Sequence, residues 1–174
     1  PSEYQVLIAD ITGDGAIDVL DIVTLINIIL FDDLIRGKGA TEMLLEYGNG
    51  NLKYTSDGII AGMQLEVTGD YTITNNTLPE GWELAYKEGT IIMFSMDGSA
   101  LESKMLFEYE GNIVIQSAIA TDWYGSNIAV SSVLIPKEFV LQSAYPNPFN
   151  PVTNLKFGLP VDSKVSIQIY NLQG

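Results

Sequence analysis

The sequence contains no cysteine and no histidine, and it has only eight lysines and arginines against twenty-two aspartates and glutamates. Without thiols and imidazoles, the chain cannot build Ser-His-Asp triads, cysteine nucleophiles or the usual structural zinc sites. Its net charge of −14, with no cluster of basic residues, repels phosphate backbones, so we expect no nucleic-acid partner. The longest apolar run, residues 22–34, is interrupted by polar side chains and is too short to span a bilayer. We therefore expect no membrane insertion.

The residues that are present predict a folded and mainly β protein. Hydrophobic residues make up 47% of the 174 positions, which is enough for one good-sized domain or two small ones. Residues 39–136 contain many short aliphatic and aromatic runs separated by turns such as "YGNGN", "SDG" and "MDGS". This pattern is typical of an antiparallel β-sandwich. Within this region Glu102, Glu108 and Glu110 cluster in sequence, with Asp97 nearby, and could form a catalytic carboxylate pair; charges on a solvated strand face are the ordinary alternative. We predict no enzyme.

Three further segments flank the predicted sandwich. Residues 1–38 contain a short alternating piece, an acidic turn and then a helix from about residue 19 to residue 36, which ends before Gly37 and Gly39. Residues 137–153 include "YPNPFNP", which predicts a stiff connector. Residues 154–174 contain two alternating runs, 155–159 and 165–169, which predict a β-hairpin. A hairpin alone is marginal in water, so we expect it to belong to a larger domain or to complete the sheet of another body.

The stretch "ADITGDGAIDVLDIVTLINIIL", residues 9–30, has the spacing of a calcium-binding loop. Calcium takes six to eight oxygen ligands, and such a loop supplies them from alternate positions around a central glycine, here Gly15. The predicted ligands are the side chains of Asp10, Thr12, Asp14, Asp18 and Asp21 and the main-chain carbonyl of Ala16. The alternative is an acidic turn that caps the helix without metal.

The helix that follows the loop is apolar almost all round, since Leu20, Val23 and Ile26 share one face while Ile28 and Ile29 lie on others. A helix of this kind must be buried on several sides. It can pack on the β domain of its own chain or on another chain, and we expect its own chain.

Three stretches resemble known families. The acidic loop and "IVTLINIIL" resemble the calcium-binding segment of dockerin domains, although only one segment is found where dockerins usually carry two. The strings "SDGIIAGMQLEVTGDYTI" and "GTIIMFSMDGSAL" are similar to cohesin-like domains, the β-sandwiches that bind dockerins. The tail "AYPNPFNPVTNLKFGLPVDSKVSIQIYNLQG" resembles the start of the Ig-like C-terminal sorting domains of proteins exported by type IX secretion, and of the similar domain of flagellar hook-capping proteins.

These resemblances imply a secreted or surface-displayed, calcium-stabilised structural module that associates with protein partners, including copies of itself in a filament. The tail implies contact with the secretion machinery through an incomplete Ig-like domain. An alternative is a non-catalytic accessory or scaffold region of a longer secreted hydrolase. A carbohydrate-binding role would use the aromatic side chains Trp82, Tyr86, Trp123 and Tyr124.

Overall fold

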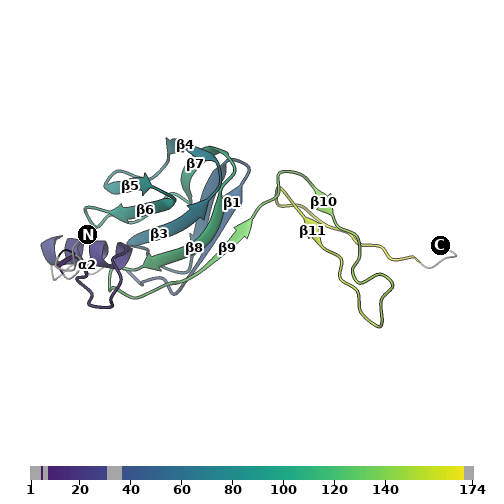
Figure 1. Cartoon of the computed structure of the whole chain (residues 1–174), viewed down its shortest axis with the longest axis horizontal. Coiled ribbons are helices and arrows are strands. Elements are labelled where there is room, and N and C mark those ends of the chain that lie inside the picture. The colour runs from purple at the N-terminus through teal and green to yellow at the C-terminus, as the bar shows by residue number, and fades with distance from the viewer. Residues whose placement is uncertain (1–4, 6–7, 31–36, 171–174) are drawn as a thin grey trace. The chain divides into compact units, whose positions relative to one another are not determined.

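The computed structural model describes residue 5 and residues 8–30 and 37–170 of the chain. The chain divides into two compact units, Pro1–Leu134 (unit 1) and Ile135–Gly174 (unit 2). Figure 1 labels their helix and strands. Each unit is described separately below.

The described part of unit 1 contains two β-sheets and the helix α2, Val19–Leu30, besides helical residues before the acidic turn. Its strands are β1 Glu42–Gly48, β2 Asn51–Ser56, β3 Gly62–Thr68, β4 Tyr71–Asn76, β5 Trp82–Lys87, β6 Thr90–Ser95, β7 Met105–Gly111, β8 Val114–Thr121 and β9 Ala129–Leu134. One sheet has the order β4-β7-β2-β1-β9 and the other the order β5-β6-β3-β8. All neighbours pair antiparallel except β1 and β9, which run parallel. The predicted fold class, mainly β with antiparallel sheets as in a sandwich, is confirmed.

The core of unit 1 comes from the alternation of apolar residues along its strands. Side chains in a strand point to opposite faces in turn, so every second residue can be buried. Leu45 of β1 and Leu65 of β3 are completely buried in a single cluster to which both sheets contribute, together with Phe107 of β7 and Met93 of β6. Each such side chain stabilises the fold by roughly 1.5–3 kcal/mol relative to an exposed position.

Helix α2 lies against β3, β6 and β8 of the second sheet (Figure 1). Its predicted continuation to Arg36 falls outside the described residues. The extended piece expected before the acidic turn is wrong where it can be checked, because Gln5, Ile8 and Ala9 are helical; Tyr4 and Val6 fall outside the described residues.

Unit 2 differs from the prediction in its strand pairing. The two short strands β10 (Val140–Leu141) and β11 (Phe157–Gly158) pair antiparallel. Residues 162–170 carry no strand, so the predicted hairpin within residues 154–174 is not formed, and the predicted connector 137–153 contributes one of the two strands. The reason lies in the hydrogen bonds between Tyr145 and Asn154, whose backbone groups exchange two bonds of 3.0 and 3.1 Å. This exchange closes the proline-rich stretch into a loop and brings β10 beside β11.

Candidate metal-binding loop

The acidic loop, residues 10–18, is folded around the carboxylate of Asp10. One oxygen of Asp10 accepts a hydrogen bond from the N–H of Gly13 at 2.7 Å, and the other accepts one from the N–H of Gly15 at 2.9 Å. Both glycines have positive φ angles, 74° and 91°, and the backbone of a residue with a side chain would be strained in this conformation. The glycine at the middle of the sequence pattern therefore has the turn-forming role that the pattern predicts.

The carboxylate of Asp21 joins the beginning of the loop to its end. Its Oδ1 accepts hydrogen bonds from the N–H of Ile11 at 2.8 Å and from the N–H and hydroxyl of Thr12 at 3.0 and 3.2 Å. Its Oδ2 accepts the N–H of Asp18 at 3.0 Å. Burial by itself raises the pKa of Asp21, but these hydrogen bonds outweigh it and the pKa lies below its usual value. Asp21 is therefore a buried and ionised acceptor.

The same contacts cap helix α2. The side chain of Asp18 accepts the N–H of Leu20 at 2.8 Å, while the side chain of Asp21 returns to the N–H of Asp18. This reciprocal arrangement is a capping box, which satisfies N–H groups that the helix itself leaves without partners. The alternative interpretation of the acidic turn, as a helix cap, thus describes a real part of its structure.

The predicted calcium ligands are only partly gathered. Thr12 donates from its hydroxyl to Asp10 at 3.4 Å and to Asp21, so these three residues lie together. Asp14 and Asp18 each accept an N–H two residues further along the chain. Within the described residues no three acidic side chains are close enough to form a metal cluster. The carboxylates of Asp14 and Asp18 each accept one of these hydrogen bonds and so keep further lone pairs, and an all-oxygen donor set is what calcium prefers. The residues therefore fit the ion, and the site stays a prediction.

The inner face of α2 anchors the loop to unit 1. Val19 and Val23 are completely buried, and with Ile26 they pack against Ala61 and Trp123. The side-chain amide of Asn27 adds a 2.8 Å hydrogen bond to the carbonyl of Trp123. The expectation that the helix packs on its own β domain is confirmed.

The outer face of α2 is apolar and exposed. Leu25, Ile28 and Ile29 follow one another at the i, i+3, i+4 spacing of a single helix face, and Ile28 and Ile29 are 69% and 67% exposed. The expectation of burial on several sides is therefore wrong for this face in the described structure. We call Leu25, Ile28 and Ile29 the α2 outer face.

The candidate sugar-binding aromatics separate into two groups. Trp82 and Trp123 are each only 5% exposed, and Trp82 donates its indole N–H to the carbonyl of Ser99 at 3.0 Å. Both tryptophans are core residues, so neither presents an exposed ring on which a sugar could stack. Tyr86 and Tyr124 are exposed.

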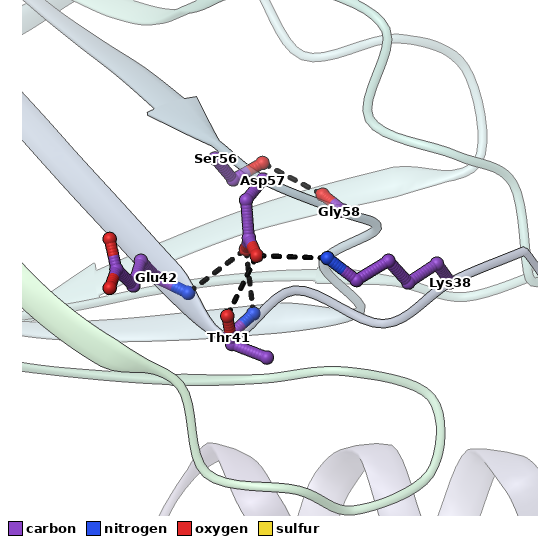
Figure 2. Close-up of polar contacts among 6 residues, drawn as sticks. All are labelled: Lys38, Thr41, Glu42, Ser56, Asp57 and Gly58. Carbon is purple, nitrogen blue, oxygen red and sulfur yellow. Dashed lines mark hydrogen bonds and ion pairs between the residues drawn. The ribbon is translucent and has the colours of Figure 1, made fainter.

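A carboxylate that sequence reasoning missed holds the chain at the start of β1. Asp57, in the turn after β2, accepts the N–H groups of Thr41 and Glu42 at 2.7 and 3.0 Å and the hydroxyl of Thr41 at 2.7 Å (Figure 2). Lys38 completes the group with an ion pair of 3.1 Å. The backbone N–H of Glu42 and the groups of Thr41 and Lys38 hold the pKa of Asp57 far below its usual value. The "SDG" string indicated a turn here, but nothing in it pointed to Thr41 or Glu42.

Two of the four candidate catalytic carboxylates, Glu108 and Asp97, show ordinary structural contacts. Glu108 is exposed on β7 and accepts a hydrogen bond from Asn75 at 3.2 Å. Asp97 accepts the N–H of Ser99 at 2.9 Å within a turn. These contacts place both carboxylates in strand and turn positions and bring no second carboxylate to either.

Comparison with known proteins adds little to this description. No family model and no curated protein matches the chain. Among solved structures, the chain is similar to a chain of the type I cohesin–dockerin complex Coh-OlpC-Doc435 from Clostridium thermocellum, with 10% identity over 59% of this chain and 94% of that one and a TM-score of 0.38. The fold assignment rests on the strand pairing given above. No helix among the described residues is long and apolar enough to cross a membrane.

Proposed function

We propose that the protein is a secreted, non-catalytic assembly module in which calcium stabilises the loop and helix α2, and in which α2 presents an apolar face to a protein partner. The observation that carries this proposal is the α2 outer face. Contiguous exposed apolar side chains mark contact sites, and helices that dock into grooves do so with anchors at the spacing of Leu25, Ile28 and Ile29.

The inner contacts of the same helix support the proposal. Because Val19 and Val23 are fixed in the core of unit 1, the outer face is held rigidly before any partner arrives. A pre-organised surface loses less conformational entropy on binding. The helix is thus built to be buried on both sides, with the second side supplied by another molecule.

Calcium would act on this surface through the loop. Residues 10–21 contain four aspartates and no basic residue, so a divalent cation would relieve their repulsion. Asp10, Thr12 and Asp21, which already lie together, would hold the ion, with Asp14, Asp18 and the carbonyl of Ala16 as further ligands. Outside the cell, even a loop with a dissociation constant of about 10⁻⁴–10⁻³ M would be useful.

The assembly that we propose is a polymer of the chain at or outside the cell surface. A contact between two different surfaces of identical molecules does not close on itself and therefore produces a filament. The tail, by its resemblance to sorting domains, would direct export. The alternative, an accessory region of a longer secreted hydrolase, predicts a chain that stays monomeric in calcium and in chelator.

The test is sedimentation velocity of the 174-residue chain in calcium and in chelator, with the variant Ile28→Lys. We expect calcium to produce larger species from the parent but not from Ile28→Lys, because a lysine at this position would be desolvated in the contact. Val133→Lys is the matched control, since Val133 is also an exposed apolar residue but lies on β9, in the sheet on which α2 does not pack. Equal masses in calcium and chelator, or assembly of Ile28→Lys like that of the parent, would refute the proposal.

A further inference from the structure

We propose that the α2 outer face of one copy docks into a groove of the next copy, on the outer surface of the sheet that contains β1, β2 and β9. This inference rests on the proposed function, in which copies of the chain form a polymer through two different surfaces, and it names the second of these surfaces. The contact joins residues of unit 1 alone.

The groove lies across three neighbouring strands at one end of their sheet. It has a volume of about 400 Å³, and β1, the end of β2 with its following turn, and β9 each contribute three residues to its lining. Leu44 of β1 lies at its centre, because Leu44 pairs with Thr55 of β2 on one side and with Ser131 of β9 on the other. Leu44 is half-buried, whereas its neighbours Met43 and Leu45 point into the core. The groove is therefore on the outer face of the sheet.

The groove matches one turn of a helix in size. Strands in a sheet lie about 4.8 Å apart, so three strands span roughly 10 Å, which is about the diameter of a helix with its side chains. Along β1, the two steps from residue 42 to residue 44 cover about 6.7 Å. The anchors Leu25, Ile28 and Ile29 span four steps of a helix, or about 6 Å. The groove can therefore take these three side chains, with Leu44 as an apolar floor.

Charge favours an uncharged helix face as the occupant, and α2 supplies one. The net charge of −14 makes copies repel one another, so a contact between copies costs least where neither surface is charged. Residues 22–30 of α2 contain no charged residue, and residues 123–136, which include β9, contain none either. In the lining of the groove, the carboxylate of Asp57 is already paired with Lys38 and bonded to two backbone N–H groups (Figure 2). Glu42 is then the remaining acidic residue of the lining, which gives a basic partner little to bind.

A second groove of unit 1 is a poorer receptor for the helix. It is smaller, about 240 Å³, and its lining includes both Glu102 and Lys104. An apolar helix face would take these charges out of water without offering them a partner, which is unfavourable. The groove over Leu44 does not impose this cost on the contact.

The two surfaces lie on opposite sides of unit 1, so their contact does not close on itself. Helix α2 packs on β3, β6 and β8, which belong to the other sheet of the sandwich. One copy therefore presents its helix on one side and its groove on the other, and it cannot fill its own groove. Head-to-tail contact of this kind adds copies in one direction, which is the geometry of a filament.

Two charge variants that block opposite sides of the contact test this pairing. Ile28→Lys blocks the helix, and Ser131→Lys should block the groove, because its lysine would lie beside Leu44 and be desolvated by the docked helix. In sedimentation velocity with calcium, each variant alone should stay monomeric. An equal mixture should form pairs of about twice 19.0 kDa and no longer species. The pair forms because the Ser131→Lys chain keeps its helix face and the Ile28→Lys chain keeps its groove.

Val133→Lys is again the matched control, since Val133 is exposed on the same strand as Ser131 but does not line the groove. It should assemble like the parent. Pair formation in the mixture also shows that both blocked variants are folded. If the parent assembles and Ile28→Lys does not, but Ser131→Lys assembles or the mixture stays monomeric, the receptor for α2 lies elsewhere and the proposed docking is overturned while the proposed function stands. A parent that is monomeric in calcium would overturn both.

Discussion

Gly62, the first residue of β3, packs directly against Val19, the first residue of helix α2. A β-carbon at position 62 would lie 2.8 Å from Cγ2 of Val19 and 3.0 Å from Cγ2 of Val23. Distances this short are repulsive between carbon atoms, whose optimal separation is about 3.5–4.0 Å. The absence of a side chain at position 62 therefore sets how closely the helix approaches the sheet, at the N-terminal end of the helix, which directly follows the acidic loop.

Gly62→Ala should weaken the attachment of α2 to unit 1. The added methyl group must displace Val19 or the helix, and overpacking of this kind typically costs about 1–3 kcal/mol of unfolding free energy. Denaturant unfolding should show this loss in the parent background and a smaller one in Val19→Ala, where the space has been vacated. Additive effects of the two substitutions would mean that Gly62 and Val19 do not limit each other.

Removal of calcium should lower the melting temperature of unit 1. A ligand that binds only the folded state stabilises it by about 2.7 kcal/mol at a hundred times its dissociation constant. Asp14→Ala should melt at the same lower temperature in calcium and in chelator, because a predicted ligand is gone. Asp70→Ala, an exposed turn residue outside the loop, should keep the calcium effect. If the parent melts identically in both buffers, the acidic loop is only a helix cap.

The strands of unit 1 could be predicted because each carries its signal locally. In β3, "GMQLEVT", the apolar residues Met63, Leu65 and Val67 alternate with polar ones, and all three are buried. The start of α2 was equally local, since Asp18 and Asp21 form the cap within three residues of each other.

What could not be predicted depends on contacts between distant residues. The pairing of β10 with β11 follows from the exchange of bonds between Tyr145 and Asn154, and no periodicity encodes that exchange. The role of Asp57 requires Thr41, sixteen residues earlier. Likewise, a helix that is apolar all round does not reveal which face meets the sheet, so the exposure of Ile28 became visible only in the structure.

Trp123 should report on the state of α2 by its fluorescence. It packs in one cluster with Val19, Val23 and Ile26 and is joined to the helix by the hydrogen bond from Asn27. In a Trp82→Phe variant, where Trp123 is the remaining tryptophan, chelation should therefore shift the emission to longer wavelength as the helix loosens. The reciprocal variant Trp123→Phe leaves Trp82, which belongs to the core cluster between the sheets, and its emission should stay constant. Equal responses of the two variants would show that chelation disturbs the whole of unit 1.

Asp57→Asn should destabilise unit 1 in a pH-dependent way. The pKa of Asp57 lies far below its usual value of 3.8, because the N–H of Glu42, the groups of Thr41 and the ammonium of Lys38 favour the ionised form. A carboxylate whose pKa is lowered by folding contributes stability that is present in full above 3.8 and is lost as the pH falls from there toward the folded-state pKa. The parent should therefore unfold at higher urea concentration than Asp57→Asn at pH 6, and the difference should shrink as the pH is lowered below 3.8.

The control variant Lys38→Met removes only one of the contacts of Asp57, an exposed ion pair that contributes little stability, and should lower the free energy of unfolding less than Asp57→Asn does at pH 6. A difference between parent and Asp57→Asn that stays constant down to pH 2.5 would show that the amide loses only hydrogen-bond geometry and that the charge of Asp57 does not stabilise the fold.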